Sequence, residues 1–483
     1  MKKALPENWE LVKLEDYLDI KGGSQPPKSE FKYKPDDGYI RLLQIRDFGN
    51  KPVPTYVKKD DVTKFCEKED ILIARYGASL GRIVTGMEGA YNVALAKVIV
   101  ENDEFSKRYL FYLLQTQIFQ TPLTMISRSA QNGFAKHEIS KIELPKPPLP
   151  TQHRIVEKIE ELFSELDNGV ENLKRAQLQL KTYRQAVLKD AFEGELTKEW
   201  RALRQAQDAE DLPTPEELLQ QIKAERKAHR ERELAEWEKE VNQWERDGEP
   251  GRKPRKPRKV KEVEPISENR LNELTELPNK WLWVKLGQVI DQPKYGTSEK
   301  CDYDFDGYGV LRIPNIGKGI IDSEDMKYAP LEEDEASKYA LQEGDILTIR
   351  SNGSIDLVGK CALIREPDTK FLHAGYLIRL RPYKGVAVSR YMLNVLSSVS
   401  LRNQIESKAK STSGVNNINS GELQDLIIPI CGVKEQRKIV NEIESRLSVV
   451  DQLEQTIKEN LQKAKALRQS ILKKAFGGEL VNE

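Results

Sequence analysis

The chain has 483 residues, of which 77 are Lys or Arg and 77 are Asp or Glu, so its formal net charge is zero. This length exceeds one ordinary domain and indicates about two to four of them. A zero net charge argues against a protein that binds nucleic acid with its whole surface, although a local basic face would still attract phosphates. No window approaches the roughly 18 apolar residues of a membrane span, and no apolar signal core follows the N-terminus, so we expect a cytoplasmic protein.

The sequence shows neither the ligand spacing of a metal site nor a phosphate-binding motif. Four cysteines, at positions 66, 301, 361 and 431, form no Cys-x-x-Cys pair, and the four histidines are equally scattered. Because zinc ligands occur at short fixed spacing, we expect buried, reduced thiols and no metal site. There is also no Gly-x-x-x-x-Gly-Lys-Ser/Thr phosphate loop.

The first globular region, residues 5–150, mixes short apolar strands with loops rich in Gly, Pro and Asn. The patterns predict strands at 53–57, 71–75 and 98–100 and a helix at 105–116. A long helix follows at 151–196, in which an apolar residue recurs every seven positions: Ile159, Leu166, Leu173, Leu180 and Val187. The intervening positions, which we also expect in the core between the helices, hold Ile155, Leu162, Ala176 and Tyr183. This period is typical of a coiled-coil seam.

A charged insert occupies residues 197–276. Pro213-Thr214-Pro215 predicts a capped helix start, and charges of both signs alternate from there to Glu245. The run 252–261 is basic, proline-rich and unable to fold alone. Two interpretations remain open for it: a solvated linker, or an arm that grips DNA phosphates and makes binding sensitive to salt.

A second globular region at 277–432 and a second long helix at 433–483 complete the chain. The globule contains a predicted helix at 388–397. The long helix has an apolar seam of Ile443, Val450, Ile457, Ala464 and Ile471, with Leu453 and Leu467 between them and the polar residues Arg446 and Asn460 at seam positions. Gly194 and Gly477-Gly478 stand where C-terminal helix caps are expected.

The two halves of the chain repeat each other. Leu-Pro-x-x-Trp occurs at 5–9 and 277–281, Asp-Ile-Leu at 70–72 and 345–347, Gln-x-x-Ile-Val at 152–156 and 436–440, and Ala-Phe-x-Gly-Glu-Leu at 191–196 and 475–480. We therefore predict a mixed α/β (α+β) protein with two similar globules and two long helices that pair with each other. The alternative is that each helix packs only on its own globule.

Polar loops recur at matching places in the two globules, but their residues differ. Arg, Asn, Gln and Ser are side chains that read base edges, although such loops are also ordinary turns. The candidate DNA-binding residues of the first globule are Lys21, Ser24, Gln25, Arg75, Tyr76, Arg128, Ser129 and Asn132. Those of the second globule are Lys294, Tyr295, Thr297, Arg350, Asn352, Ser411, Ser413 and Asn416. Two domains that each recognise a different half of a DNA site would have polar loops at matching places with different residues.

Together the duplicated motifs resemble the specificity subunits of type I restriction–modification enzymes, over residues 5–196 and 277–480. The resemblance implies two target-recognition domains, each reading one half of a bipartite DNA site, and an antiparallel pairing of the helices that sets the gap. It also implies two adenine-methylating modification subunits and two ATP-driven restriction subunits as partners. S-adenosylmethionine, ATP and magnesium would bind those partners, and this chain would carry no catalytic centre. The rival interpretation is a two-headed coiled-coil scaffold that does not read DNA.

Overall fold

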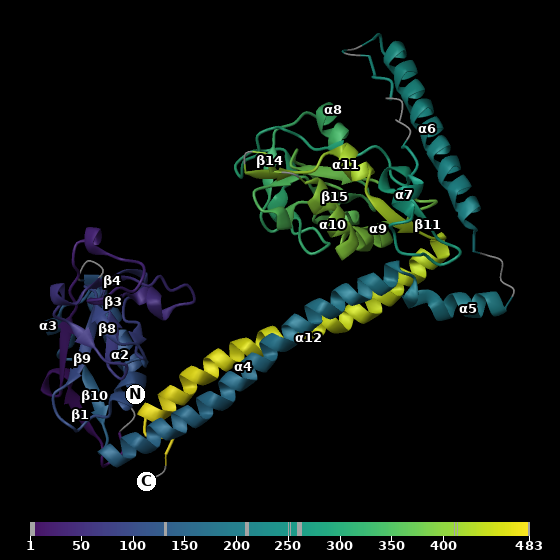
Figure 1. Cartoon of the computed structure of the whole chain (residues 1–483). Helices are drawn as coiled ribbons and strands as arrows, with labels where there is room; N and C mark the ends of the chain where they lie inside the picture. Colours follow the sequence, from purple (N-terminus) through teal and green to yellow (C-terminus); the bar gives the residue numbers. More distant parts are fainter. Residues whose placement is uncertain are drawn as a thin grey trace. The chain divides into compact units, whose positions relative to one another are not determined.

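A computed structural model describes residues 5–129, 133–207, 212–249, 251, 253–257, 263–409, 411–412 and 414–481. The chain divides into two compact units (Figure 1). The first unit comprises Met1–Gln177 and Gln455–Glu483, and the second comprises Leu178–Glu454. Each unit therefore contains one globule together with segments of both long helices. Among the described residues, no helix has the length and apolar character needed to cross a bilayer.

The first globule is built on two four-stranded sheets and a two-stranded ribbon. The first sheet has the order β2 (Leu18–Gly22), β9 (Leu95–Val100), β6 (Ile71–Ala74) and β7 (Ile83–Val84). The second has the order β4 (Tyr56–Lys58), β3 (Tyr39–Leu43), β8 (Gly89–Tyr91) and β5 (Phe65–Cys66), and the ribbon pairs β1 (Glu10–Lys13) with β10 (Glu143–Lys146). Helices α1 (Lys107–Leu113), α2 (Gln117–Ser129) and α3 (Lys136–Ile139) complete the globule. β6 is buried at all four positions, as an apolar central strand should be.

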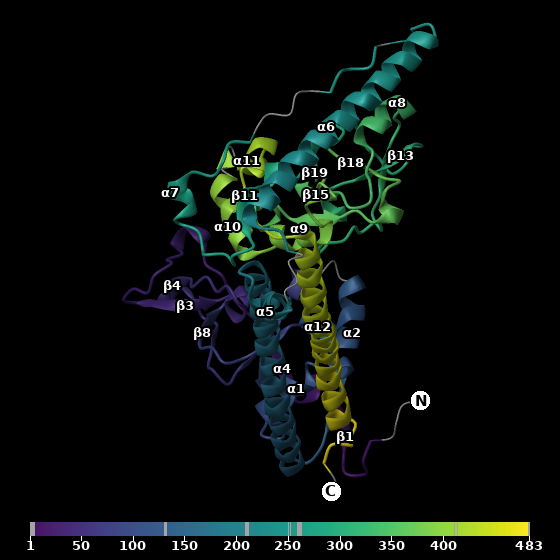
Figure 2. The same cartoon turned by 90° about the vertical axis from the view of Figure 1, so that its right-hand side faces the viewer.

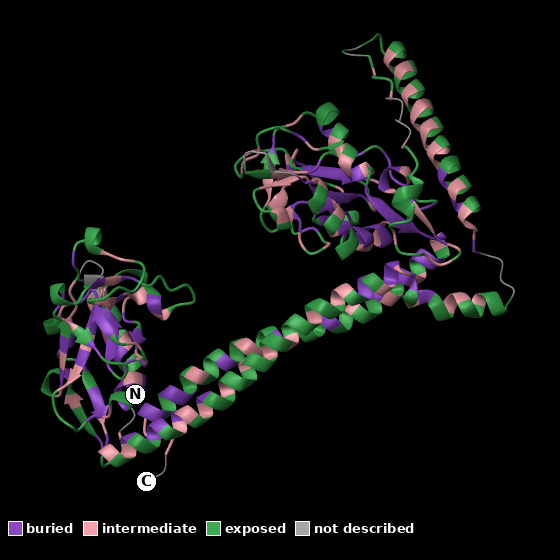
Figure 3. Ribbon diagram, in the orientation of Figure 1, coloured by how far each residue is buried: buried purple, intermediate pink, exposed green. Residues whose placement is uncertain are grey.

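The second globule repeats this plan. Its main sheet has the order β12 (Lys294–Tyr295), β19 (Leu377–Leu380), β15 (Ile346–Ile349) and β17 (Cys361–Leu363), and its ribbon pairs β11 (Leu282–Lys285) with β22 (Ile427–Ile430). Two three-stranded sheets have the orders β14 (Lys327–Ala329), β13 (Tyr308–Leu311), β18 (Leu372–His373), and β16 (Ser351–Asn352), β21 (Val415–Asn417), β20 (Ser411–Thr412). The helices are α8 (Glu333–Ala336), α9 (Ser389–Leu396), α10 (Val399–Lys408) and α11 (Ser420–Gln424). In both globules the central strands are buried (Figure 3), and helices such as α1 and α9 contribute further buried residues.

Most predicted elements are confirmed. The strands predicted at 71–75 and 98–100 are β6 and the end of β9, and the helices predicted at 105–116 and 388–397 contain α1 and α9. The strand predicted at 53–57 is wrong over 53–55, where Val53 is exposed and Pro54 interrupts, so that β4 begins at Tyr56. Cys66, Cys361 and Cys431 are buried free thiols, whereas Cys301 is only half-buried.

The two long helices are α4 (Leu149–Phe192) and α12 (Val433–Phe476), of 44 residues each. They lie side by side in Figures 1 and 2. In the second unit Arg184 of α4 pairs with Asp451 and Glu454 of α12, and Thr197, just beyond α4, donates a hydrogen bond to Glu435. A later position on α4 therefore meets an earlier position on α12, so the helices run antiparallel. In the first unit Arg468 pairs with Asp167 at 2.6 Å, which repeats the Arg184–Asp451 pair at the equivalent sequence positions.

The seven-residue stripe is confirmed, but part of the predicted seam is wrong. Ile159, Val187, Ile443, Val450, Ile457, Ala464 and Ile471 are buried, and Leu166, Leu173 and Leu180 are half-buried. Tyr183, Leu453 and Leu467 are instead 44%, 46% and 51% exposed, and Arg446 is exposed too. On α12 the seam steps four residues from Ile443 to the half-buried Leu447 and three more to Val450. In the sequence, Leu453 and Leu467 stand three residues after a seam position, whereas Leu447 and Leu461 stand four residues after one, so the apolar pattern alone did not distinguish the two orders.

Each globule also holds the end of the other repeat's helix. In the first unit Ile471, Leu472, Ala475 and Phe476 join the core that contains Ile155 and Ile159. In the second unit Val187, Leu188, Ala191 and Phe192 join the core that contains Ile439 and Ile443. Each helix therefore packs on its own globule at its start and on the other globule at its end. The single-globule packing considered above describes only the first half of each helix.

The repeated sequence motifs mark these junctions. Gly478 has φ +75° and its backbone lies against Pro6, and Gly194 has φ +85° and lies against Pro278, so the helix-ending glycines touch the Leu-Pro motif that opens each globule. Both glycines adopt the left-handed conformation expected of helix caps. The Leu-Pro-x-x-Trp and Ala-Phe-x-Gly-Glu-Leu motifs therefore belong to one contact, made twice.

Candidate nucleic-acid interface

In the first globule three polar loops meet at the end of β6. Arg75 follows β6, and its Nη1 lies 2.6 Å from where a Cβ on Gly22 would stand. Tyr76 forms an isolated backbone bridge with Gly133 and lies beneath the Arg75 guanidinium at 5.1 Å. The loops that begin at Lys21, Arg75 and Arg128 were predicted separately, and the described residues of all three now lie together.

The other candidates of the first globule differ in availability. Lys21 is exposed and lies 3.7 Å from Asp19, and Gln25 is exposed and accepts a 3.5 Å hydrogen bond from Asn92. The Ser24 hydroxyl is buried and has no hydrogen-bond partner among the described residues. Asn132 lies outside the described residues, and Arg128 and Ser129 are described only as the backbone end of α2.

In the second globule the equivalent loops form a connected polar cluster. The Arg350 guanidinium lies 4.7 Å above the Tyr295 ring, and Arg350 Nε donates to Asn417 Oδ1 at 3.3 Å. β16 pairs with β21, which places Asn352 opposite Asn416, and the Asn416 amide donates to the carbonyls of Asn352 and Gly353. Tyr295, Arg350, Asn352 and Asn416 were all candidates, and they are brought together.

Not every candidate of this globule can read a base. Thr297 is 4% exposed and its hydroxyl accepts a 3.0 Å hydrogen bond from the Glu299 amide, so it orders a turn. Lys294 is exposed at the edge of β12. Ser411 is placed by its backbone in β20, and Ser413 lies outside the described residues. Asn417, which accepts a hydrogen bond from Arg350, was not among the candidates, because its position depends on the pairing of β21 with β16, which the sequence does not show.

The Asp-Ile-Leu motif is structural rather than part of this interface. Asp70 accepts hydrogen bonds from Lys97 at 2.6 Å and Lys107 at 2.8 Å, and Asp345 accepts two from Arg381 at 2.6 and 2.7 Å. Burial alone would raise the pKa of Asp70, but the two lysines outweigh it and lower this pKa to about 2. In both repeats this aspartate ties the start of the central strand to its neighbours.

The described part of the insert contains a long helix and a segment that contacts it. Helix α6 (Pro215–Arg246) begins at the predicted cap, where Thr214 accepts from the Glu217 amide. The described residues 253–257 run along it: the carbonyl of Pro254 accepts from Trp237 at 3.0 Å and that of Pro257 from Arg230 at 2.8 Å. Lys256 and Lys253 lie over Trp237 and Trp244 at 5.1 and 5.4 Å. The described residues 253–257 therefore contact α6, although Lys253, Arg255 and Lys256 are exposed; residues 252 and 258–262 lie outside the described residues, and neither interpretation of the basic run is tested.

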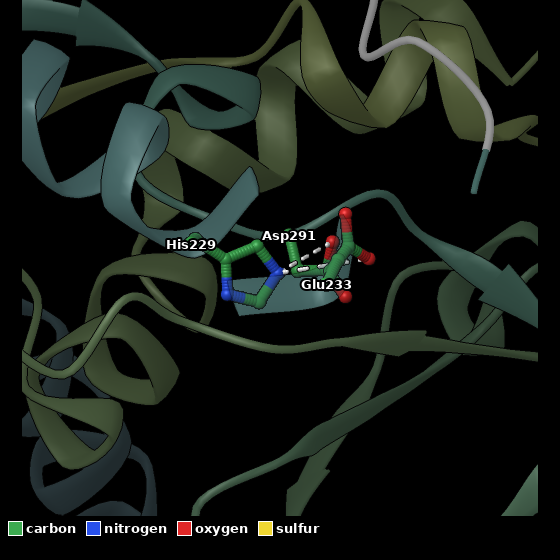
Figure 4. A group of neighbouring side chains, drawn as sticks. All are labelled: His229, Glu233 and Asp291. Atoms are coloured by element: carbon green, nitrogen blue, oxygen red, sulfur yellow. Dashed lines mark ion pairs between the residues drawn. The ribbon is translucent and has the colours of Figure 1, made fainter. Parts of the chain in front are cut away.

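One side-chain cluster was not predicted from the sequence. His229 and Glu233, one turn apart on α6, face Asp291 of the second globule (Figure 4); His229 Nε2 lies 3.4 Å from Asp291 and 3.9 Å from Glu233. Histidine and carboxylate side chains are residue types that ligate metals, but Arg379 forms an ion pair with Asp291 at 3.0 Å and Arg230 forms one with Glu233 at 3.3 Å. Burial raises the pKa of Asp291, yet His229 and Arg379 lower it more. Two adjacent guanidinium groups disfavour a further cation, so the cluster fastens α6 to the globule.

Comparisons with known proteins agree with the duplicated plan. The family model for the type I restriction modification DNA specificity domain matches residues 6–175 and 278–463. The chain is 25% identical to the EcoKI specificity subunit of Escherichia coli K12, covering 99% of this chain and 90% of that one. It is 23% identical to the EcoBI specificity subunit of Escherichia coli, covering 99% and 87%.

Two solved structures share the fold. A chain from a study of complex assembly and conformational transition of the type I R-M system superposes with a TM-score of 0.66 at 19% identity, covering 99% of both chains. The HsdS subunit from Thermoanaerobacter tengcongensis superposes with a TM-score of 0.50 at 18% identity, also covering 99% of both. At these identities the likeness shows the architecture, two mixed α/β domains with long helices.

Proposed function

Because this chain belongs to the type I restriction modification DNA specificity family, we propose that it is the DNA-reading subunit of a restriction–modification complex, in which each globule reads one half of a bipartite site. One observation carries the two-reader proposal. The loop cluster around Arg75 and the cluster around Arg350 stand at equivalent places in the two repeats and differ in their other residues. Two equivalent surfaces with different side chains are suited to two different sequences.

The paired helices are proposed to set the gap between the half-sites. A helix of 44 residues rises about 66 Å along its axis, and one turn of DNA is about 34 Å. The Arg184–Asp451 and Arg468–Asp167 pairs mark the same register of the two helices in the two units, and the buried seam residues hold it. A fixed register of this kind is what a spacer of constant length requires.

The partners are proposed to be two modification subunits, which methylate adenine, and two ATP-driven restriction subunits. In this proposal the chain has no catalytic centre, works in the cytoplasm, and leaves S-adenosylmethionine, ATP and magnesium to its partners. Its own task is to place the target adenines, flipped out of the duplex, before the modification subunits. The names of the relatives as specificity subunits of type I restriction enzymes support this division of labour.

The test is to express the chain with its modification subunits and to map the methylated adenines on random DNA. The proposal expects one bipartite motif with a gap of constant length. A mobility shift with the same complex should then favour DNA that carries the motif. A scaffold that does not read DNA would give neither a motif nor a sequence-dependent shift, and that result would reject the proposal.

A further inference from the structure

Arg75 and Arg350 occupy the same position in the two repeats. Each follows the last residue of the central strand, and each backbone amide donates to the same strand-connecting segment, Arg75 to Ala94 at 2.8 Å and Arg350 to Tyr376 at 2.9 Å. This frame is built from main-chain hydrogen bonds at the end of a buried strand. It therefore presents an arginine at one fixed place on each globule.

The residue of the neighbouring edge strand that contacts the arginine differs between the repeats. The strand pairs Gly22–Ala96 and Tyr295–Ile378 are equivalent in the two main sheets, so Tyr295 stands where the first globule has Gly22. The Arg75 side chain occupies the space beside Gly22, and its Nη1 lies 2.6 Å from the position that a Cβ on Gly22 would take. Arg350 instead lies on the Tyr295 ring, at 4.7 Å from its centre. The tyrosine therefore holds the second guanidinium away from the sheet.

Two further contacts hold Arg350 in this raised position. Its Nε donates to Asn417 Oδ1 at 3.3 Å, and Asn417 is placed by the pairing of β21 with β16. The Tyr295 hydroxyl accepts from the Ser420 amide at 3.0 Å, which fixes the ring. Nη1 and Nη2 of Arg350 have no hydrogen-bond or ion-pair partner among the described residues. The hydrogen bond through Nε therefore orients the guanidinium, and Nη1 and Nη2 remain available to donate to DNA.

We propose that Arg350, supported by Tyr295 and held by Asn417, reads a guanine in the second half-site. Two parallel N–H groups match the O6 and N7 acceptors that guanine presents in the major groove. A preorganised guanidinium loses less conformational freedom on binding than a free side chain. Arg75 lies against Gly22 and 5.1 Å from the ring of its neighbour Tyr76, a different arrangement, so the two half-sites differ at the corresponding base pair. The inference rests on the proposed function and assigns one base contact within it.

The experiment uses the chain in complex with its modification subunits and the bipartite motif mapped as above. Binding is measured on duplexes in which each G·C pair of the second half-site is replaced in turn, and with 7-deazaguanine at the same places. At one position the wild-type complex should lose about 10- to 100-fold in affinity. Arg350→Ala should bind native and replaced duplexes equally at that position, and Arg350→Lys, which lacks the planar fork, should discriminate less than the wild type. Tyr295→Leu and Asn417→Ala should weaken the discrimination at this same base pair.

Arg75→Ala is the matched control, since it removes the equivalent arginine and should leave base preference in the second half-site unchanged. A phosphate contact would predict that Arg350→Ala weakens binding equally on all duplexes and reduces the salt dependence, which would overturn the proposal. A second half-site without a G·C pair would also overturn it. These results leave the proposed function intact, because the wild-type complex would still show a bipartite motif.

Discussion

Replacing Gln436 with Met tests how the second long helix is joined to its globule. Gln436 is 0% exposed at the start of α12. Its Nε2 donates to the carbonyls of Val386 at 2.8 Å and Cys431 at 2.7 Å, and its Oε1 accepts from the Val388 amide at 2.8 Å. Met has a similar size but no group that can replace these bonds, so three buried backbone groups lose their partner.

Each unsatisfied buried group costs about 1 to 3 kcal/mol, and partial relaxation makes about 3 to 6 kcal/mol a reasonable total. Hydrogen exchange of the full-length chain reports this locally, because about 1.4 kcal/mol corresponds to a tenfold faster opening. We expect amides of α9 and of the first turns of α12 to exchange at least about 100-fold faster. Gln462→Met, at an exposed position of α12, is the matched control and should change little. An acceleration below about tenfold for Gln436→Met would refute the assigned role.

Two other changes follow from the same structure. Gly194→Ala puts an alanine in a left-handed conformation and places its Cβ 2.4 Å from Pro278, so the free energy of unfolding should fall by about 2 kcal/mol or more. Gly169 lies in open space on α4, so Gly169→Ala should raise the free energy of unfolding by up to about 1 kcal/mol. Thermal melting measures both changes, and equal melting temperatures of the two variants would contradict this expectation. Burial lowers the pKa of His373 to about 4, below the free value of about 6.5, so between these values only the unfolded chain binds the proton and stability should decrease as the pH falls. The urea midpoint of the wild type should therefore drop more between about pH 7.5 and 5 than that of His373→Asn, and parallel drops would exclude His373 as the cause.

Local sequence patterns were sufficient for several elements and for the repeat. The buried strand at 71–74, the capped start of α6 and the seven-residue stripes were all readable, because each depends on neighbours within a few residues. The assignment of Leu453 and Leu467 to the seam failed for the same reason: periodicity shows that a stripe exists, but the neighbouring leucines at 447 and 461 satisfy it equally well. Only the packed partner helix decides between them.

The repeat predicted that the two long helices pair, but individual side-chain contacts between distant segments could not be predicted. Nothing local indicates that Gly478 touches Pro6, or that His229 of the insert faces Asp291. The candidate loops were found by their composition and their recurrence. Which residue supports which, as Tyr295 supports Arg350, depends on strand register across 55 positions of sequence. The division of the loop residues into supporting and presenting side chains therefore required the structure.

Lengthening both helices tests the spacer most directly. Seven residues inserted after Gln177 and seven after Glu454 extend α4 and α12 where the two units divide, and they add about 10 Å by helix rise, or up to about three base pairs of DNA. Methylated adenines mapped with the modified complex should show the same two half-sites with a longer gap. Unchanged spacing together with altered half-site sequences would contradict the account, because the helices would then affect base reading rather than distance.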